Sequence, residues 1–168
     1  FLHNMEQKNK QVVLIAHDIR SAHNVGAFLR TADGAGVEKI FLTGYTPVPA
    51  SKKFMLTTAE KQIQKTALGA EKTMLWEKRE LLSELLSELK RDGYILYALE
   101  QDDKSVVYDQ YPEAQKIALL VGNEVDGVPE SLLEQADAIL EIPMRGSKNS
   151  LNVSVATGVV LYELLKEK

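Results

Sequence analysis

Residues 138–156, AILEIPMRGSKNSLNVSVA, hold a strand, a loop and the start of a helix in direct succession. The apolar run at 138–142 predicts a buried strand, and Pro143 ends it because proline cannot donate a backbone hydrogen bond to a sheet. A loop of small polar residues follows, and Ser150 or Asn152 is expected to cap the next helix. The free N–H groups at the start of such a helix suit an anion or the polar end of a ligand.

The same alternation of strands and helices extends through the chain. We predict strands at residues 11–16, 39–43, 94–99, 116–121 and 138–142. We predict helices at 22–35, 80–91, 129–135 and about 152–166. Residues 50–78 show no clear period, although Thr57 or Thr58 could cap a short helix there.

The predicted strands are nearly all apolar, which is typical of a parallel sheet covered on both faces. The expected fold class is therefore α/β, with a mostly parallel sheet flanked by helices on both faces. We expect one domain over residues 11–168. Residues 1–10, which are polar and include Met5 after four other residues, are expected to be a disordered or truncated N-terminal segment.

Composition narrows the class of protein further. Hydrophobic residues make up 45% of the 168 residues, enough for a substantial core. Cysteine is absent, so disulfides, thiolate metal sites and a cysteine nucleophile are excluded, and we expect no metal. No apolar run approaches the roughly 20 residues of a membrane span, and no signal-peptide pattern is present, so we expect a cytoplasmic protein. The net charge of −4 leaves only a local basic patch for contact with nucleic acid.

Two further segments place polar residues after a predicted strand, where open α/β sheets bind their ligands. In residues 24–32, NVGAFLRTA, Asn24 and Arg30 are six positions apart and lie on different helical turns; a cap and a solvated arginine would also explain them. In residues 120–128, LVGNEVDGV, a strand runs into a turn whose glycines permit close approach of a ligand, although an ordinary tight turn has the same composition. Neither a P-loop nor a dinucleotide fingerprint is present.

Together, the three segments resemble the three motifs of the SpoU/TrmH family of SPOUT-class RNA methyltransferases. Residues 24–31 resemble its Asn-x-Gly-x-x-x-Arg-Thr motif, and residues 122–127 its Gly-x-Glu-x-x-Gly motif. Residues 142–154 resemble its Ile-Pro-Met-x-Gly-x-x-x-Ser-Leu-Asn-Val-Ser motif, which is the most specific of the three. The motifs occur in the family's order, and residues 65–71 are similar to a segment of its compact TrmH-like members.

The resemblance implies transfer of a methyl group from S-adenosylmethionine to a ribose 2′-hydroxyl of tRNA or rRNA. It also implies a deep trefoil knot at the C-terminal end of the domain. The residues that it assigns to the cofactor are Leu99, Gly122, Ile142, Met144, Ser150 and Leu151. Family members form homodimers, and the last helix of this chain is apolar on more than one side, which fits a partner subunit.

The resemblance makes Arg30 the central catalytic residue. A guanidinium group, with a pKa above about 12, is a poor base near neutral pH. Two roles therefore stay open: Arg30 removes the proton of the hydroxyl, or it holds the RNA phosphate and stabilises the developing charge. The other residues implied as catalytic are Asn24, which orients Arg30 or the ribose, Glu124, which pairs with Arg30 or Asn24, and Ser150 and Asn152.

The expected RNA contacts are Arg20, Lys65, Arg145 and Lys148. Further lysines at 52, 53, 61 and 72 surround Lys65, whereas much of the acid is expected elsewhere, at Asp102, Asp103, Glu113, Glu134 and Asp137. His3, His17 and His23 match no catalytic position and are expected to be structural or exposed. Two alternatives stay open: an RNA-binding protein of this fold without catalysis, and an unrelated α/β enzyme such as a flavodoxin-like nucleotide-binding protein.

Overall fold

The computed structural model describes residues 10–52 and 54–166, so the prediction for residues 1–10 falls almost entirely outside the described part. The strands are β1 (Gln11–His17), β2 (Lys39–Thr43), β3 (Trp76–Arg79), β4 (Ile95–Leu99), β5 (Val106–Val107), β6 (Lys116–Val121) and β7 (Ala138–Glu141). The helices are α1 (Ala22–Ala35), α2 (Thr58–Ala67), α3 (Ala70–Thr73), α4 (Leu82–Arg91), α5 (Glu130–Leu133) and α6 (Val153–Leu164).

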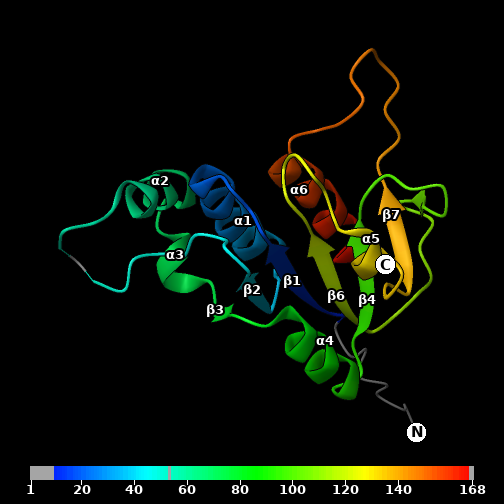
Figure 1. Cartoon of the computed structure of the whole chain (residues 1–168), viewed down its shortest axis with the longest axis horizontal. Helices are drawn as coiled ribbons and strands as arrows, with labels where there is room; N and C mark the ends of the chain where they lie inside the picture. The colour runs from blue at the N-terminus through cyan, green and yellow to red at the C-terminus, as the bar shows by residue number, and fades with distance from the viewer. Residues whose placement is uncertain (1–9, 53, 167–168) are drawn as a thin grey trace, which may run out of the picture.

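All the strand pairs are parallel, in a seven-stranded sheet of order β3-β2-β1-β6-β4-β7-β5. Strand β1 is central, since it pairs with β2 on one side and with β6 on the other. This arrangement confirms the predicted parallel α/β sheet. The carboxyl ends of β1, β6, β4 and β7 consequently lie along one edge, where the motif segments begin (Figure 1). The knot stays a prediction from the resemblance.

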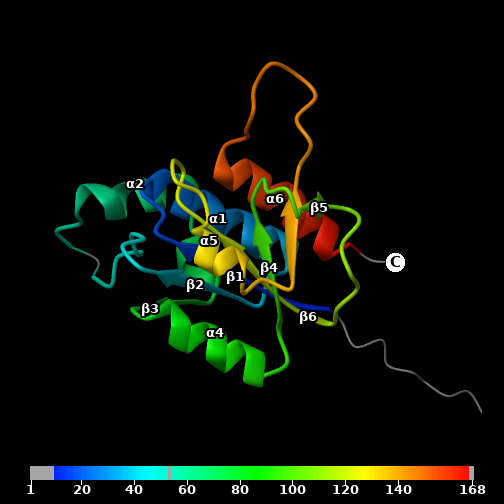
Figure 2. The ribbon, with the colours of Figure 1, turned by 45° about the vertical axis from the view of Figure 1, so that its right-hand side comes forward.

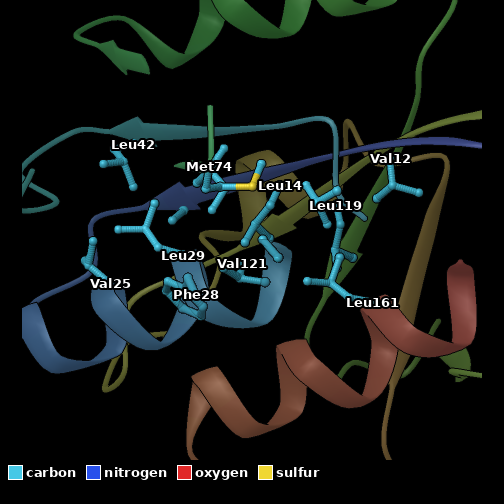
Figure 3. Close-up of a cluster of buried hydrophobic side chains, with 14 of the residues drawn as sticks. Val12, Leu14, Val25, Phe28, Leu29, Leu42, Met74, Leu119, Val121 and Leu161 are labelled. Atoms are coloured by element: carbon cyan, nitrogen blue, oxygen red, sulfur yellow. The ribbon is translucent and has the colours of Figure 1, made fainter. Parts of the chain in front are cut away.

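Helices cover both faces of the sheet, as the apolar strands predict. Figure 2 shows α4 on one side of the sheet and α1 and α6 on the other. Side chains alternate along β1, so that Leu14 packs in the larger cluster with α1 and α6 while Ile15 packs in the smaller one with α4. Figure 3 shows Phe28 and Leu29 of α1 facing this larger cluster.

The helix ends follow local capping chemistry. The hydroxyl of Ser21 accepts from the backbone N–H of Asn24 at the start of α1, and Gly36, with a φ of 84°, ends the helix in the left-handed conformation that favours glycine. Of the two predicted caps of α6, Asn152 takes the position: its side-chain oxygen accepts from the backbone N–H groups of Ser154 and Val155. Thr57, one of the two candidates at α2, forms a full capping box there.

Candidate functional site

A cavity of about 810 Å³ lies at the carboxyl ends of β4, β6 and β7. Its lining comes from the turn after β6, the segment after β4, the end of β7 and the loop that leads into α6. All six residues that the resemblance assigns to the cofactor line it: Leu99, Gly122, Ile142, Met144, Ser150 and Leu151. These six residues, which are separated by up to about fifty positions of sequence, thus line one cavity. The loop from β7 to α6, drawn in orange, projects from the body of the molecule beside this edge (Figures 1 and 2).

The cavity is acidic. Its lining contains six carboxylates: Glu100, Asp102, Glu124, Asp126, Glu130 and Glu141. None of the lining residues that the structure describes is a lysine, an arginine or a histidine. The expectation that Asp102 and other acidic residues lie away from the site is therefore wrong for Asp102, because the segment that directly follows β4 lines the cavity. The local field favours a ligand group that carries positive charge.

The carboxylate of Glu124 joins the cavity to the start of α1. One oxygen accepts from the backbone N–H of Arg20 at 2.8 Å; the other accepts from the backbone N–H of Ser21 at 2.9 Å and from the side-chain amide of Asn24 at 2.9 Å. Burial alone would raise the pKa of Glu124, but these hydrogen bonds outweigh it and hold the pKa below the ordinary 4.5. Of the two partners expected for Glu124, the structure shows Asn24 and not Arg30.

Asn24 connects the first motif to the third. Its side-chain oxygen accepts from the amide of Asn152 at 3.2 Å, while its own amide donates to Glu124. Asn24 is buried, so these bonds satisfy polar atoms that water reaches poorly. Asn152 in turn caps α6. The three motifs therefore meet in one continuous network, Glu124–Asn24–Asn152, beside the cavity.

The motif glycines allow close backbone approach. A Cβ atom on Gly26 would lie 2.4 Å from the backbone oxygen of Ile63, so this glycine lets α1 pack directly on α2. A Cβ atom on Gly122 would lie 2.4 Å from the backbone oxygen of Gly127, where the turn after β6 closes on itself. Asn123 shapes this turn, since its side-chain oxygen accepts from two backbone N–H groups within it.

Sequence reasoning missed Glu100 and Gln101. The carboxylate of Glu100 accepts from the backbone N–H of Val128 at 2.9 Å, and the side chain of Gln101 donates to the backbone oxygen of Asn149 at 2.7 Å. These bonds tie the segment after β4 to the second and third motif segments. The sequence did indicate them as candidate site residues, because both are polar and directly follow the strand predicted at residues 94–99.

Arg30 lies outside the cavity lining and is exposed on α1. Among the residues that the structure describes, no hydrogen bond or ion pair holds its guanidinium group. Nearby residues of α1 face α6: a Cβ atom on Gly158 of α6 would lie 3.3 Å from a methyl carbon of Thr31, and one on Gly34 would lie 3.1 Å from the hydroxyl of Tyr162. Because Arg30 is exposed, its N–H donors are available to a partner from outside the chain.

The residues expected to contact RNA are all exposed, namely Arg20, Lys65, Arg145 and Lys148, as are Lys52, Lys61 and Lys72. Lys53 lies outside the described residues. Arg145 and Lys148 are in the loop before α6, whereas Lys65 is on α2, on the far side of α1 (Figure 1). The basic residues therefore form two separate groups in one chain and not the single patch that the sequence suggested.

Of the two histidines that the structure describes, one has side-chain contacts and the other is exposed. His17 contacts the hydroxyl of Thr43 at 2.9 Å and the carboxylate of Asp18 at 3.4 Å. Burial lowers the pKa of His17; Asp18 opposes this effect and Lys78 adds to it. His23 is exposed, and His3 lies outside the described residues. Neither His17 nor His23 lines the cavity.

Within residues 10–52 and 54–166, no group of three or more histidine, aspartate or glutamate side chains is arranged to hold a metal ion. In the same ranges, none of the helices has the length and apolar character needed to cross a membrane.

The family model of the SpoU rRNA methylases matches residues 11–162. The chain is 36% identical over 166 residues to a protein of Haemophilus ducreyi named 23S rRNA (guanosine-2'-O-)-methyltransferase RlmB, covering 98% of this chain and 63% of that protein. It is 32% identical over 164 residues to the tRNA (guanosine(18)-2'-O)-methyltransferase of Aquifex aeolicus, covering 98% of this chain and 73% of the relative.

Solved structures of methyltransferases are similar to this chain as well. A TrmH/SpoU tRNA modifying enzyme of A. aeolicus superposes with a TM-score of 0.77 at 31% identity, covering 94% of this chain and 75% of that one. An AdoMet-bound rRNA methyltransferase of Sinorhizobium meliloti superposes with a TM-score of 0.79 at 26% identity, covering 92% of this chain and 55% of that one.

A parallel α/β sheet, a cavity lined by two of the motifs and a hydrogen-bond network that joins the first motif to them define an α/β protein of the SPOUT type. The chain belongs to the SpoU rRNA methylase family. Membership confirms the resemblance drawn from the motifs and excludes the unrelated flavodoxin-like alternative. The chain spans 63% of the length of the H. ducreyi relative and 55% of the S. meliloti chain.

Proposed function

We propose that this protein transfers the methyl group of S-adenosylmethionine to a ribose 2′-hydroxyl in tRNA or rRNA. The observation that carries the proposal is that the second and third motif segments line one cavity, while Asn24 of the first motif is hydrogen-bonded to Glu124 and Asn152 in that lining. The names of the relatives support it, since they are guanosine-2'-O-methyltransferases that act on 23S rRNA and on tRNA. The same names support the expectation of a cytoplasmic location.

The cavity fits the proposed methyl donor in size and in chemistry. Small-molecule sites typically occupy about 300–1,000 Å³ and combine apolar walls with a few polar groups, and the cavity of about 810 Å³ lies within that range. Leu99, Ile142 and Leu151 provide apolar walls for the adenine. The six carboxylates suit a ligand with a sulfonium and an ammonium group, because both are cations. S-adenosylmethionine, when bound, supplies the electrophilic methyl group.

We propose that Glu124, Asn24 and Asn152 position α1 and α6 against the cavity, and that Ser150 and Asn152 hydrogen-bond at the donor or the target ribose. Arg30 is then the group that meets the RNA. Its exposure suits binding of phosphate and stabilisation of the alkoxide charge, for which the guanidinium fork is well shaped. Removal of the hydroxyl proton by Arg30 itself is the alternative role.

The basic residues are proposed to contact RNA phosphates in two places. Arg145 and Lys148 lie in the projecting loop between β7 and α6. Arg20 lies between β1 and α1, and its backbone N–H binds Glu124. Lys65 belongs to the second group, on α2. Two separated groups suit a folded RNA that spans the site.

We also propose that the protein acts as a homodimer through α6. One side of this helix packs into the core through Thr157, Val160, Leu161 and Leu164. The other side exposes Val155, Val159 and Tyr162, which follow the four- and three-residue spacing of a helical stripe. Such a continuous apolar stripe on an outer helix is expected to be covered by a partner, and a second copy offers the same stripe in return.

The direct test is methyl transfer to RNA. Total tRNA and rRNA from cells without this protein are incubated with the protein and S-adenosylmethionine carrying a labelled methyl group. We expect label in one RNA class, at a nucleotide that resists alkaline cleavage, because a 2′-O-methyl group removes the attacking hydroxyl. Calorimetric binding of S-adenosylmethionine without label in either RNA would support a binding protein without catalysis; label on a base would contradict the ribose assignment.

A further inference from the structure

Tyr45 combines a fixed position with an exposed aromatic ring. The side chain is 59% exposed, yet the side-chain amide of Asn123 binds its hydroxyl oxygen at 2.6 Å. Its backbone N–H donates to the carboxylate of Asp18 at 3.1 Å. These two hydrogen bonds hold the ring of Tyr45 in one orientation, which an aromatic side chain on an ordinary surface loop does not require.

Asp18, which binds the turn that holds Tyr45, has an unusual backbone conformation. Asp18 has a φ of 52°, a left-handed conformation that non-glycine residues rarely adopt, and Gly44 has a φ of 61°. A Cβ atom on Gly44 would lie 1.8 Å from the Asp18 carboxylate. The side chain of Lys78 donates to the backbone oxygens of Gly44 and Thr46 and closes the turn. Strain of this kind persists where surrounding contacts fix it, commonly beside functional sites.

Tyr45 is also beside the cavity. Its anchor, Asn123, is a lining residue between Gly122 and Glu124 of the second motif, and it donates to the backbone oxygen of Asp18 as well. Glu124 binds the backbone N–H of Arg20, whose side chain is exposed. Tyr45 and Arg20 are therefore hydrogen-bonded to two neighbouring residues, Asn123 and Glu124. An aromatic residue and a cationic residue thus lie at the edge of the proposed methyl-transfer site.

We propose that the ring of Tyr45 stacks on a nucleobase of the RNA next to the methylation site, while Arg20 contacts the adjoining phosphate. This inference rests on the proposed function. RNA loops present unstacked bases that proteins bind on aromatic side chains, and each stacked base contributes about 1–3 kcal/mol on alanine substitution. The anchors at the hydroxyl and the backbone orient the ring in advance, which reduces the entropy lost on binding.

The test compares Tyr45→Phe with Tyr45→Leu. Both variants lose the hydroxyl bond to Asn123, but only the phenylalanine variant keeps a ring. The Kd for the RNA class that the wild type methylates is measured by filter binding, the Kd for S-adenosylmethionine by calorimetry, and the Tm by thermal unfolding. We expect Tyr45→Leu to weaken RNA binding at least about fivefold relative to Tyr45→Phe, with equal Tm and cofactor affinity in the pair.

Equal RNA affinity of the two variants, with wild-type methyl transfer intact, would overturn the stacking role and leave the proposed function standing. Absence of methyl transfer by the wild type on both RNA classes would instead refute the proposed function. A lower molecular mass of Tyr45→Leu in light scattering, with RNA affinity equal to that of Tyr45→Phe, would also overturn the proposal, because the ring would then face a second copy of the chain.

Discussion

The side-chain amide of Asn152 donates to the side-chain oxygen of Asn24 across 3.2 Å, although 128 positions of sequence separate the two residues. Each residue also has a structural role, since Asn24 binds Glu124 and Asn152 caps α6. The cap of one helix is thereby fixed to the first turn of another. The geometry of the site thus depends on how α1 and α6 begin, and changes at those positions have consequences for both stability and cofactor binding.

Glu124→Gln is expected to destabilise the protein by about 1–3 kcal/mol at pH 7, because the new amide group places a donor among three donors. The pKa of Glu124 is lowered in the folded protein, so its contribution is full above the ordinary value of 4.5 and is lost as the pH falls through the folded value. Urea unfolding at pH 7, 5 and 3 should show a difference between wild type and variant that is constant to about pH 5 and then shrinks. The exposed Glu134→Gln serves as the control, and a difference that grows below pH 5 would contradict the assignment.

Gly26→Ala is expected to destabilise the protein by about 1–3 kcal/mol, although alanine is the better helix former. The added Cβ atom would meet the backbone oxygen of Ile63 at 2.4 Å, and a backbone atom cannot move away as a side chain can. Gly158→Ala in α6 is the matched control, because its Cβ atom would lie 3.3 Å from a methyl carbon of Thr31. Thermal unfolding should separate the two variants; similar Tm values would show that α1 and α2 do not need their close approach.

Arg30→Ala is expected to reduce methyl transfer about 100-fold or more, in line with the loss of a group that stabilises developing charge. The Tm and the affinity for S-adenosylmethionine should stay as in the wild type, because Arg30 is exposed and outside the cavity lining. Arg91→Ala, an exposed arginine at the end of α4, should leave the rate unchanged. Full activity of the Arg30 variant would refute both roles proposed for it, and partial rescue by Arg30→Lys would favour the charge role.

The acidic cavity is expected to prefer positively charged ligands. S-adenosylmethionine carries a sulfonium group and sinefungin an ammonium group at the position where S-adenosylhomocysteine has a neutral sulfur. We expect both to bind about fivefold more tightly than S-adenosylhomocysteine. Raising the salt concentration from about 0.05 to about 0.5 M should reduce this preference through screening. Calorimetry with the three ligands measures both effects. Equal affinities at low salt would show that the six carboxylates do not act on the reacting centre.

Val159→Asp is expected to break the proposed dimer, because it buries a charge in the apolar stripe of α6. Light scattering at micromolar concentration should show the mass of two chains for the wild type and of one chain for the variant. Leu81→Asp, at another exposed apolar residue distant from α6 in sequence, is the control. A wild type with the mass of one chain would refute the dimer.

Much of the fold follows from the sequence because the central strands are short apolar runs between clear turn residues. The bounds of β2 and β6 agree with those predicted, and so do those of α1. Strand β3 was missed because WEKR is polar and lies at an edge of the sheet, where burial imposes no apolar pattern. Helix α2 was hard to define because its ten residues include only two that are buried, Ile63 and Ala67.

The six residues that the resemblance implies for the cofactor line one cavity, whereas Arg30 lies outside its lining and the arrangement of the side chains was not predicted. The motif resemblance gathered Leu99, Met144 and the other cofactor residues, which the structure places around one cavity. It did not show whether Glu124 would bind Asn24 or Arg30, since sequence spacing does not reveal which way a side chain leaves a helix. The acidity of the cavity was missed too, because Asp102 and Glu130 follow strands whose neighbours are known only from the finished sheet.

The pairing of β1 with β6 joins Gln11 to Lys116 and Ala16 to Val121, so the middle of the sheet is closed by segments from distant parts of the chain. Contacts of such long range slow folding, because a large loop must close before they form. The cavity contains residues after β6 and after β7, and it is complete only once those strands have joined the sheet. A ligand that binds this cavity therefore selects fully folded chains and draws the folding equilibrium toward them by mass action.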